Sequence, residues 1–197
     1  MKALVMTILA MAALFGWVVH GEAAPALAGK KPLIVYFSWG GNTRVVANQI
    51  KELTGGDLFE AQTVKSYPKE YRATTEQAKN ELNSNARPAL KVSKLPNLGS
   101  YDTVIICHPN WWGTMPTAMM TLLEANDLSG KKIAQVVTHE GSGVGRSSGD
   151  LKKLCPKSEI LSSTATRGGG VKNAQRDVEN WLKGDGHISK APAVLSK

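Results

Sequence analysis

Three short stretches of this chain combine the residue types that could hold a ligand. The first reads Ser38-Trp39-Gly40-Gly41-Asn42-Thr43. Its glycines let the backbone approach an anion, its hydroxyl and amide side chains can donate hydrogen bonds, and a helix starting there would add free N–H groups. This predicts a phosphate cradle without a lysine. The alternative is an ordinary glycine turn with an asparagine cap. The ATP-type pattern G-x-x-x-x-G-K-[ST] and the dinucleotide pattern G-x-G-x-x-G are both absent.

The second stretch reads Pro109-Asn110-Trp111-Trp112-Gly113-Thr114-Met115-Pro116. Tryptophan is costly to expose and offers a flat face for stacking. Beside a phosphate cradle, two adjacent tryptophans indicate a planar aromatic ligand with a phosphate tail. We expect one indole to pack beneath the loop and the other to contact the ligand, and the sequence does not distinguish them.

The third stretch reads Thr138-His139-Glu140-Gly141-Ser142-Gly143. Its glycines leave backbone N–H and C=O groups free for the edge of a ring. A hydrolase triad of His139, Ser142 and Asp150 is an alternative, but the nucleophile pattern G-x-S-x-G is missing.

Each of these loops follows a predicted strand: a continuous apolar run at 32–38, a second clear buried strand at 103–108 and a third strand at 132–138. Such runs are typical of strands buried on both faces of a parallel sheet. Two further strands are predicted at 57–61 and 159–166. Ligands bind beyond the carboxyl ends of such strands, so the three loops are expected to meet at one edge.

Helical patterns alternate with these strands. The first is expected from Asn42 or Thr43, either of which can be its cap, and it ends at Gly55-Gly56. The next is expected over 66–83, with Ser66 as cap and Pro68 in its first turn. Thr114 is expected to cap a third, with Pro116 near its start. Others are expected at 148–154 and 171–184. The alternation predicts an α/β fold with a doubly wound, five-stranded parallel sheet.

Length and composition narrow the class of protein. The 197 residues suit one domain, and two cysteines exclude a disulfide scaffold or a cysteine-rich metal module. Cys107 and Cys155 are interpreted as structural, and a disulfide between them stays open. The net charge of +8 comes without a compact Lys/Arg cluster or a nucleic-acid-binding motif, so a solvated basic surface is expected and nucleic-acid binding is not.

The N-terminus has the pattern of a secretory signal. Met1 and Lys2 precede an apolar run over 3–19, and Ala26-Leu27-Ala28 offers a cleavage site. We therefore predict a signal peptide over 1–28, a ligand-binding domain over 29–184 and a flexible tail over 185–197. The protein is expected to be exported, either periplasmic or secreted. The alternative is an uncleaved segment that anchors it to the membrane.

These stretches resemble the flavodoxin family, in the branch whose middle loop reads Trp-Trp-Gly-Thr-Met-Pro. The resemblance covers about residues 32–183. Besides the three loops, it is carried by Tyr67-Pro68-Lys69-Glu70-Tyr71 and Asn85-Ala86-Arg87-Pro88. It implies a sheet in the order 2-1-3-4-5 and non-covalently bound FMN.

Carried over residue by residue, the resemblance implies distinct roles for the three loops. The first would hold the FMN phosphate, Trp111 and Trp112 would wall the flavin ring, the Gly113 peptide would face its N5 atom, and residues 139–143 would line its pyrimidine edge. The predicted contact residues are Ser38, Trp39, Gly40, Gly41, Asn42, Thr43, Pro109, Asn110, Trp111, Trp112, Gly113, Thr138, His139, Glu140, Gly141, Ser142 and Gly143.

The chain departs from the family pattern at three of these positions. Gly40 replaces a hydroxyl residue, Trp39 is bulky for its place, and Glu140 puts a carboxylate near the ring. The basic charge and apparent export also set it apart from many acidic, cytoplasmic flavodoxins.

The resulting hypothesis is an electron-transfer flavoprotein whose partner is a redox protein or a small acceptor such as a quinone. An FMN-dependent NAD(P)H:quinone-type reductase is the first alternative, with His108, His139 or Tyr71 contacting its substrate. A non-redox module that binds another phosphate compound is the second.

Overall fold

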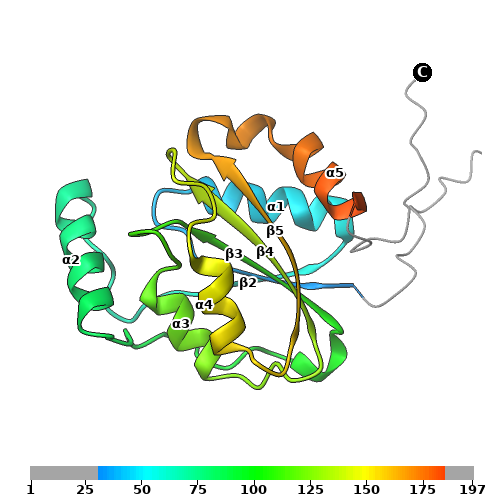
Figure 1. Cartoon of the computed structure of the whole chain (residues 1–197), viewed down its shortest axis with the longest axis horizontal. Coiled ribbons are helices and arrows are strands. Elements are labelled where there is room, and N and C mark those ends of the chain that lie inside the picture. The colour runs from blue at the N-terminus through cyan, green and yellow to red at the C-terminus, as the bar shows by residue number, and fades with distance from the viewer. Residues whose placement is uncertain (1–30, 185–197) are drawn as a thin grey trace, which may run out of the picture.

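One parallel sheet organises the molecule. The computed structural model describes residues 31–184, so the predicted signal segment 1–28 and the tail 185–197 lie outside the described residues. The sheet has the order β2-β1-β3-β4-β5 (Figure 1), which confirms the predicted order. Its strands are β1 (Leu33–Tyr36), β2 (Asp57–Glu60), β3 (Thr103–Pro109), β4 (Lys132–His139) and β5 (Glu159–Arg167).

Two apolar layers, one on each face of the sheet, form the core. Alternate side chains of β1 show the division, because Leu33 and Val35 enter one cluster and Ile34 and Tyr36 the other. Helices α1 (Asn42–Thr54) and α5 (Gln175–Gly184) cover one face, while α3 (Thr117–Glu124) and α4 (Ser147–Leu154) cover the opposite face (Figure 1). Burial on both faces explains the unbroken apolar runs in the sequence.

Helix α2 (Tyr71–Asn83) stands apart from these two layers, at the end of the molecule drawn on the left of Figure 1. Only Thr74 and Ala78 of this helix are buried. Two short 3-10 helices, Leu98–Ser100 and Gly168–Asn173, complete the described chain, and the second occupies the start of the helix predicted over 171–184. Within residues 31–184, no helix has the length and apolar character that a bilayer crossing requires.

The predicted starts of three helices were wrong. Gly41, in the left-handed conformation at φ 94°, precedes α1 in place of the predicted Asn42 or Thr43 cap, and the Ser38 hydroxyl accepts from the Arg44 N–H in the first turn. Helix α2 begins at Tyr71, because the Glu70 carboxylate accepts hydrogen bonds from the N–H groups of Arg72 and Ala73. Pro116 precedes α3, while the Thr114 hydroxyl donates to Asp150 Oδ2 at 2.7 Å instead of capping the helix.

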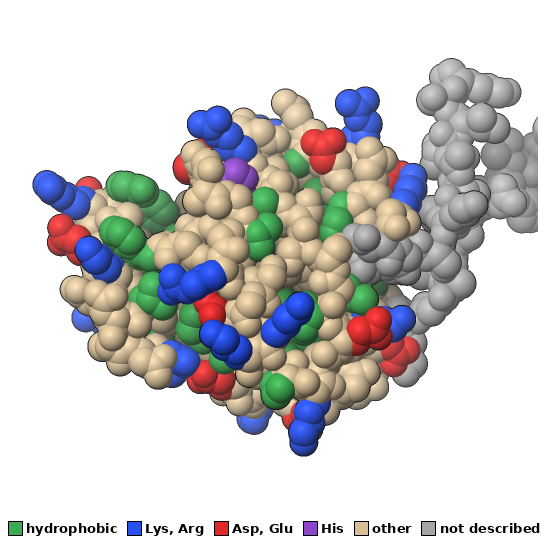
Figure 2. Space-filling view, in the orientation of Figure 1, with side chains coloured by type: hydrophobic (Ala, Val, Ile, Leu, Met, Phe, Trp, Pro, Cys, Tyr) green, Lys and Arg blue, Asp and Glu red, His purple; other side chains and the backbone are tan. Residues whose placement is uncertain are grey.

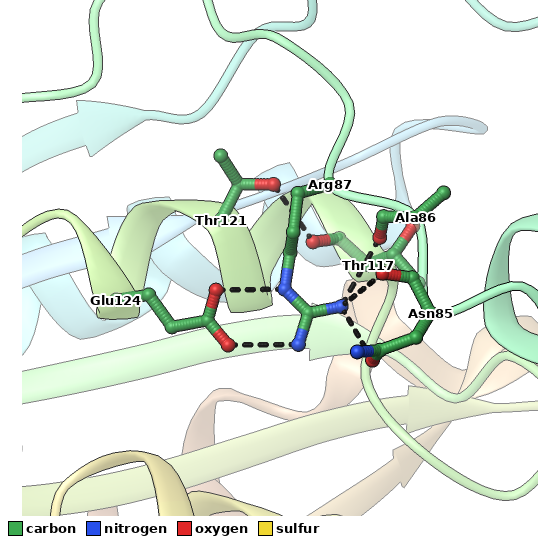
Figure 3. Close-up of polar contacts among 6 residues, drawn as sticks. All are labelled: Asn85, Ala86, Arg87, Thr117, Thr121 and Glu124. Carbon is green, nitrogen blue, oxygen red and sulfur yellow. Dashed lines mark hydrogen bonds and ion pairs between the residues drawn. The ribbon is translucent and has the colours of Figure 1, made fainter.

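An ion pair between Arg87 and Glu124 connects the segment after α2 to α3 (Figure 3). The Arg87 guanidinium makes two hydrogen bonds of 2.7 Å to the Glu124 carboxylate, and its Nη1 donates to the Asn85 side chain at 2.9 Å. Asn85 is itself left-handed at φ 52°. A bidentate arginine–carboxylate pair fixes both position and direction, so this contact sets where α2 ends relative to the sheet.

The two cysteines are buried and free. Cys107 packs with α1 and α5, whereas Cys155 packs with α3 and α4. The sheet therefore separates the two thiols, and the disulfide left open by the sequence does not form in this structure. Burial raises the pKa of the Cys155 thiol to about 11 and also raises that of Cys107.

A buried histidine makes the stability of this fold depend on pH. His108 is fully buried, and its Nδ1–H donates to the Pro109 carbonyl while its Nε2 accepts from Gln135 Nε2 at 2.9 Å. Burial lowers the pKa of His108 from 6.5 to about 4. Between pH 6.5 and about pH 4, the unfolded chain therefore binds a proton that the folded chain does not bind. The free energy of unfolding consequently falls as the pH falls through this interval.

We expect the free energy of unfolding to drop by about 2 kcal/mol between pH 7 and pH 5. Urea denaturation at the two pH values measures the drop. His108→Gln removes the titrating group, so its free energy of unfolding should change much less over the same interval. An equal drop in this variant would assign the pH dependence to other groups.

Candidate ligand-binding site

The three predicted loops enclose one cavity of about 720 Å³ at the carboxyl ends of β1, β3 and β4. Small-molecule sites typically occupy about 300–1,000 Å³. Residues from each of the three loops line it, and these are Ser38, Trp39, Gly40, Asn42, Thr43, Pro109, Asn110, Trp111, Trp112, Thr138, His139, Glu140, Gly141 and Ser142.

Three predicted contact residues, Gly41, Gly113 and Gly143, do not line this cavity. They shape its loops. The Gly113 N–H donates to Asn110 Oδ1 at 2.9 Å and the Gly113 carbonyl accepts from Arg146 N–H at 2.8 Å. Asn110 Nδ2 also donates to the Gly143 carbonyl at 2.8 Å. The second and third loops are thus braced against each other through Asn110, and the Gly113 peptide groups take part in this bracing.

Helix α2 supplies a fourth wall, of which the sequence indicated only Tyr71, as a possible substrate contact. Tyr71, Thr74, Thr75 and Ala78 line the cavity from this helix. The nearest sequence signal was the Tyr67–Tyr71 stretch of the family resemblance. Figure 2 shows hydrophobic side chains gathered at the end of the molecule where α2 lies.

Two indole hydrogen bonds hold this wall in place. Trp39 Nε1 donates to the Pro68 carbonyl just before α2, at 2.8 Å, and Trp112 Nε1 donates to the Thr75 carbonyl within α2, at 2.9 Å. The position of α2 therefore depends on tryptophans that also line the cavity.

The two adjacent tryptophans have different surroundings. Trp111 is half-buried and packs edge-to-face against Phe37 and Tyr67, at ring-centroid distances of 5.3 and 5.0 Å. Trp112 is 48% exposed, at the apex of a turn with φ 54°, and Lys79 Nζ lies 4.9 Å from its ring centroid. Trp111 is thus the indole that packs beneath the loop, although both line the cavity.

The first loop joins the N-terminus of α1 to the third loop. The first N–H groups of a helix have no carbonyl partner within it, so they are available to an anion. Of these, Arg44 N–H is taken by Ser38 Oγ at 3.2 Å. Thr43 Oγ1 and Thr138 Oγ1 share a buried hydrogen bond of 2.8 Å. The loop therefore has a fixed shape and retains donors at Asn42 and Thr43.

Charge is scarce around the cavity. Among residues 31–184, Glu140 is the only Asp, Glu, Lys or Arg that lines it. Arg44 faces away and pairs with Glu60 at 2.5 Å. A phosphate here would be held by N–H groups and hydroxyls, as the lysine-free loop predicted.

A glycine of the last 3-10 helix fits closely beside this carboxylate. A Cβ on Gly168 would lie 2.0 Å from Glu140 Oε1 and 2.5 Å from Asn42 Nδ2. The sequence pattern gave no sign of this long-range approach. Within residues 31–184, no group of three or more His, Cys, Asp or Glu side chains is arranged to hold a metal ion.

A doubly wound sheet in this order, with an open cavity at the ends of its first, third and fourth strands, defines a flavodoxin-like protein. The family model for flavodoxins matches residues 31–184. This chain belongs to the flavodoxin family.

Solved structures agree with this assignment. A proposed flavoprotein from Bacteroides eggerthii DSM 20697 is 28% identical, with a TM-score of 0.71 over 80% of this chain and 98% of that one. A second, from Bacteroides uniformis ATCC 8492, is 28% identical with a TM-score of 0.70 over 79% and 99%.

A flavoprotein from Lactobacillus acidophilus NCFM, solved in complex with FMN, shares the fold at 23% identity and a TM-score of 0.61 over 73% and 97%. No match was found among the curated proteins.

Proposed function

We propose that this chain binds FMN non-covalently in the cavity of about 720 Å³ and acts as an electron-transfer flavoprotein. The observation that carries the proposal is the meeting of a helix N-terminus and two tryptophans around one cavity. FMN needs donors for its phosphate and apolar walls for its ring, and this cavity offers both.

The residues present fit FMN in kind. Asn42 and Thr43 would hold its phosphate at the start of α1, and Trp111 and Trp112 would flank its ring. Bound FMN supplies reversible electron transfer, while the protein contributes binding, orientation and electrostatics. Glu140 places a negative charge in the cavity, which opposes the gain of negative charge there and favours the oxidised flavin.

FMN titration tests the binding proposal. We expect apoprotein to quench FMN fluorescence at one equivalent per chain and the complex to be yellow. Asn42→Ala should weaken FMN binding by about tenfold if it removes a hydrogen bond to the charged phosphate. Riboflavin, which lacks the phosphate, should bind both proteins alike. A wild-type protein that takes up no FMN would contradict the proposal.

The carrier and the reductase predict different reductive chemistry. His108, one of the residues considered for substrate contact, is fully buried and does not line the cavity. Tyr71 and His139 do line it. A carrier should be reduced in two resolved one-electron steps, and its partner would be a redox protein or a small acceptor such as a quinone. Steady NAD(P)H oxidation with a quinone would favour the reductase.

We also propose that the protein acts outside the cytoplasm, on the strength of the charged start and apolar run in residues 1–28. Periplasmic or secreted protein beginning near residue 29 would support this. Full-length protein confined to the cytoplasm would contradict it.

A further inference from the structure

A second cavity lies on the other side of the first loop. Its volume is about 500 Å³, and it is lined by the ends of β1 and β2, by the segment preceding α2, and by Arg44 and Lys91. Ser38, Trp39 and Gly40 line both cavities. The second cavity is therefore separate from the proposed FMN site but shares a wall with it.

The charges around this cavity are unbalanced. Arg44, Lys69 and Lys91 line it with one carboxylate, Glu60. That carboxylate is already engaged, because Oε1 accepts from Arg44 at 2.5 Å and Oε2 accepts from Gln62 at 3.2 Å. Lys91 Nζ donates only to a neutral amide oxygen, Gln62 Oε1, at 3.3 Å, and Lys69 has no ion-pair partner among residues 31–184. Two cationic groups are thus available to an anion.

The interior of the cavity combines an apolar surface with a hydroxyl. Phe37 and Tyr67 are in edge-to-face contact at 5.7 Å, and both line it. Thr63 also lines it, and its hydroxyl makes no hydrogen bond with the described part of the chain. The Thr63 hydroxyl is not sealed from solvent, so it can donate a hydrogen bond to a polar group of a ligand in this cavity.

We propose that this second cavity binds a small organic carboxylate with an aromatic body. The carboxylate would pair with Lys69 and Lys91 and accept from the Thr63 hydroxyl, and the ring would pack against Phe37 and Tyr67. The site goes beyond the proposed FMN function, since none of these five residues lines the FMN cavity.

Benzoate titrated into the FMN-free protein by calorimetry tests this site. We expect saturable binding of one benzoate per chain. Acetate, which lacks the ring, should bind more weakly, and benzylamine, which carries the opposite charge, should not bind. Absence of saturable benzoate binding, or equal binding of benzylamine, would overturn the proposal.

Variants locate the binding. Lys69→Gln with Lys91→Gln should weaken benzoate binding by about tenfold or more, and Thr63→Val by several-fold. The matched control, Lys152→Gln with Lys172→Gln, removes two exposed positive charges elsewhere and should change the affinity less than about twofold. Unchanged affinity in the first double variant would refute the site.

A final titration distinguishes this site from the FMN cavity. Benzoate should still bind when FMN is saturating, and complete displacement by FMN would assign it to the larger cavity and overturn the proposal. A chain that binds benzoate but not FMN would contradict the proposed function and leave this inference standing, and the reverse result would do the opposite.

Discussion

Gly145→Ala should lower the free energy of unfolding by about 3 kcal/mol or more. A Cβ at this position would lie 2.3 Å from the Gly113 carbonyl oxygen and 2.9 Å from its carbon, and both are backbone atoms that cannot rotate away. The residue is also left-handed at φ 62°, which is unfavourable for alanine. Relief requires the second and third loops to separate, so FMN affinity should fall by about tenfold as well.

Gly143→Ala is the matched control. This glycine lies two positions earlier at φ 60°, but a Cβ there would meet nothing within 4 Å. Only the conformational penalty of about 1–2 kcal/mol applies. Urea denaturation measures both variants, and FMN titration measures the second effect. Equal destabilisation by the two substitutions would mean that the close contact between Gly145 and Gly113 adds nothing to the loss of unfolding free energy.

Trp111→Ala should destabilise the fold by about 3 kcal/mol, near the lower end for tryptophan removal because the side chain is half-buried. It removes two edge-to-face contacts, to Phe37 and Tyr67, and opens space between the cavity and the core. FMN affinity should also fall, because a wall of its cavity is lost. Urea denaturation and FMN titration on the same preparation measure both effects.

Trp112→Ala separates binding from stability. Its side chain is 48% exposed and makes one hydrogen bond, to the Thr75 carbonyl, so the loss in unfolding free energy should be about 1 kcal/mol. FMN affinity should fall as it does for Trp111→Ala. If Trp112→Ala destabilised the protein as much as Trp111→Ala, the assignment of Trp111 as the packed indole would be wrong.

The three central strands, β1, β3 and β4, were predictable because they are buried on both faces of the sheet. The apolar run at 103–108 matches β3 to within one residue, and the run at 132–138 likewise matches β4. Because these strands are buried along most of their length, they consist mainly of apolar residues and can be recognised from the local sequence. The loops that follow them were placed correctly for the same reason.

Helix starts were less predictable, because side chains far away in the sequence compete for the capping groups. Ser66 and Pro68 resemble a helix start, but the Pro68 carbonyl accepts from Trp39 Nε1 and from Thr74 Oγ1, and Glu70 provides the cap. The Thr114 hydroxyl is likewise used by Asp150. Such partners are known only once the fold has formed.

The candidate site likewise has one part that local sequence predicts and one part that it does not. The loop residues could be predicted because glycines, tryptophans and hydroxyl side chains cluster in the sequence. Thr74, Thr75 and Ala78 of α2 could not be predicted, because such side chains are common in helices and line the cavity only through the position of the helix. The closeness of Gly168 to Glu140 and Asn42 joins residues far apart in the chain, and nothing local indicates it.

The separation of Cys107 from Cys155 by the sheet has a consequence for where this chain can fold. No covalent cross-link holds the described domain together, and neither thiol is exposed to an oxidant. The native state should therefore form equally well in reducing and oxidising surroundings. Production in an ordinary bacterial cytosol, without any thiol oxidase or isomerase, should yield the same folded domain as passage through an export route.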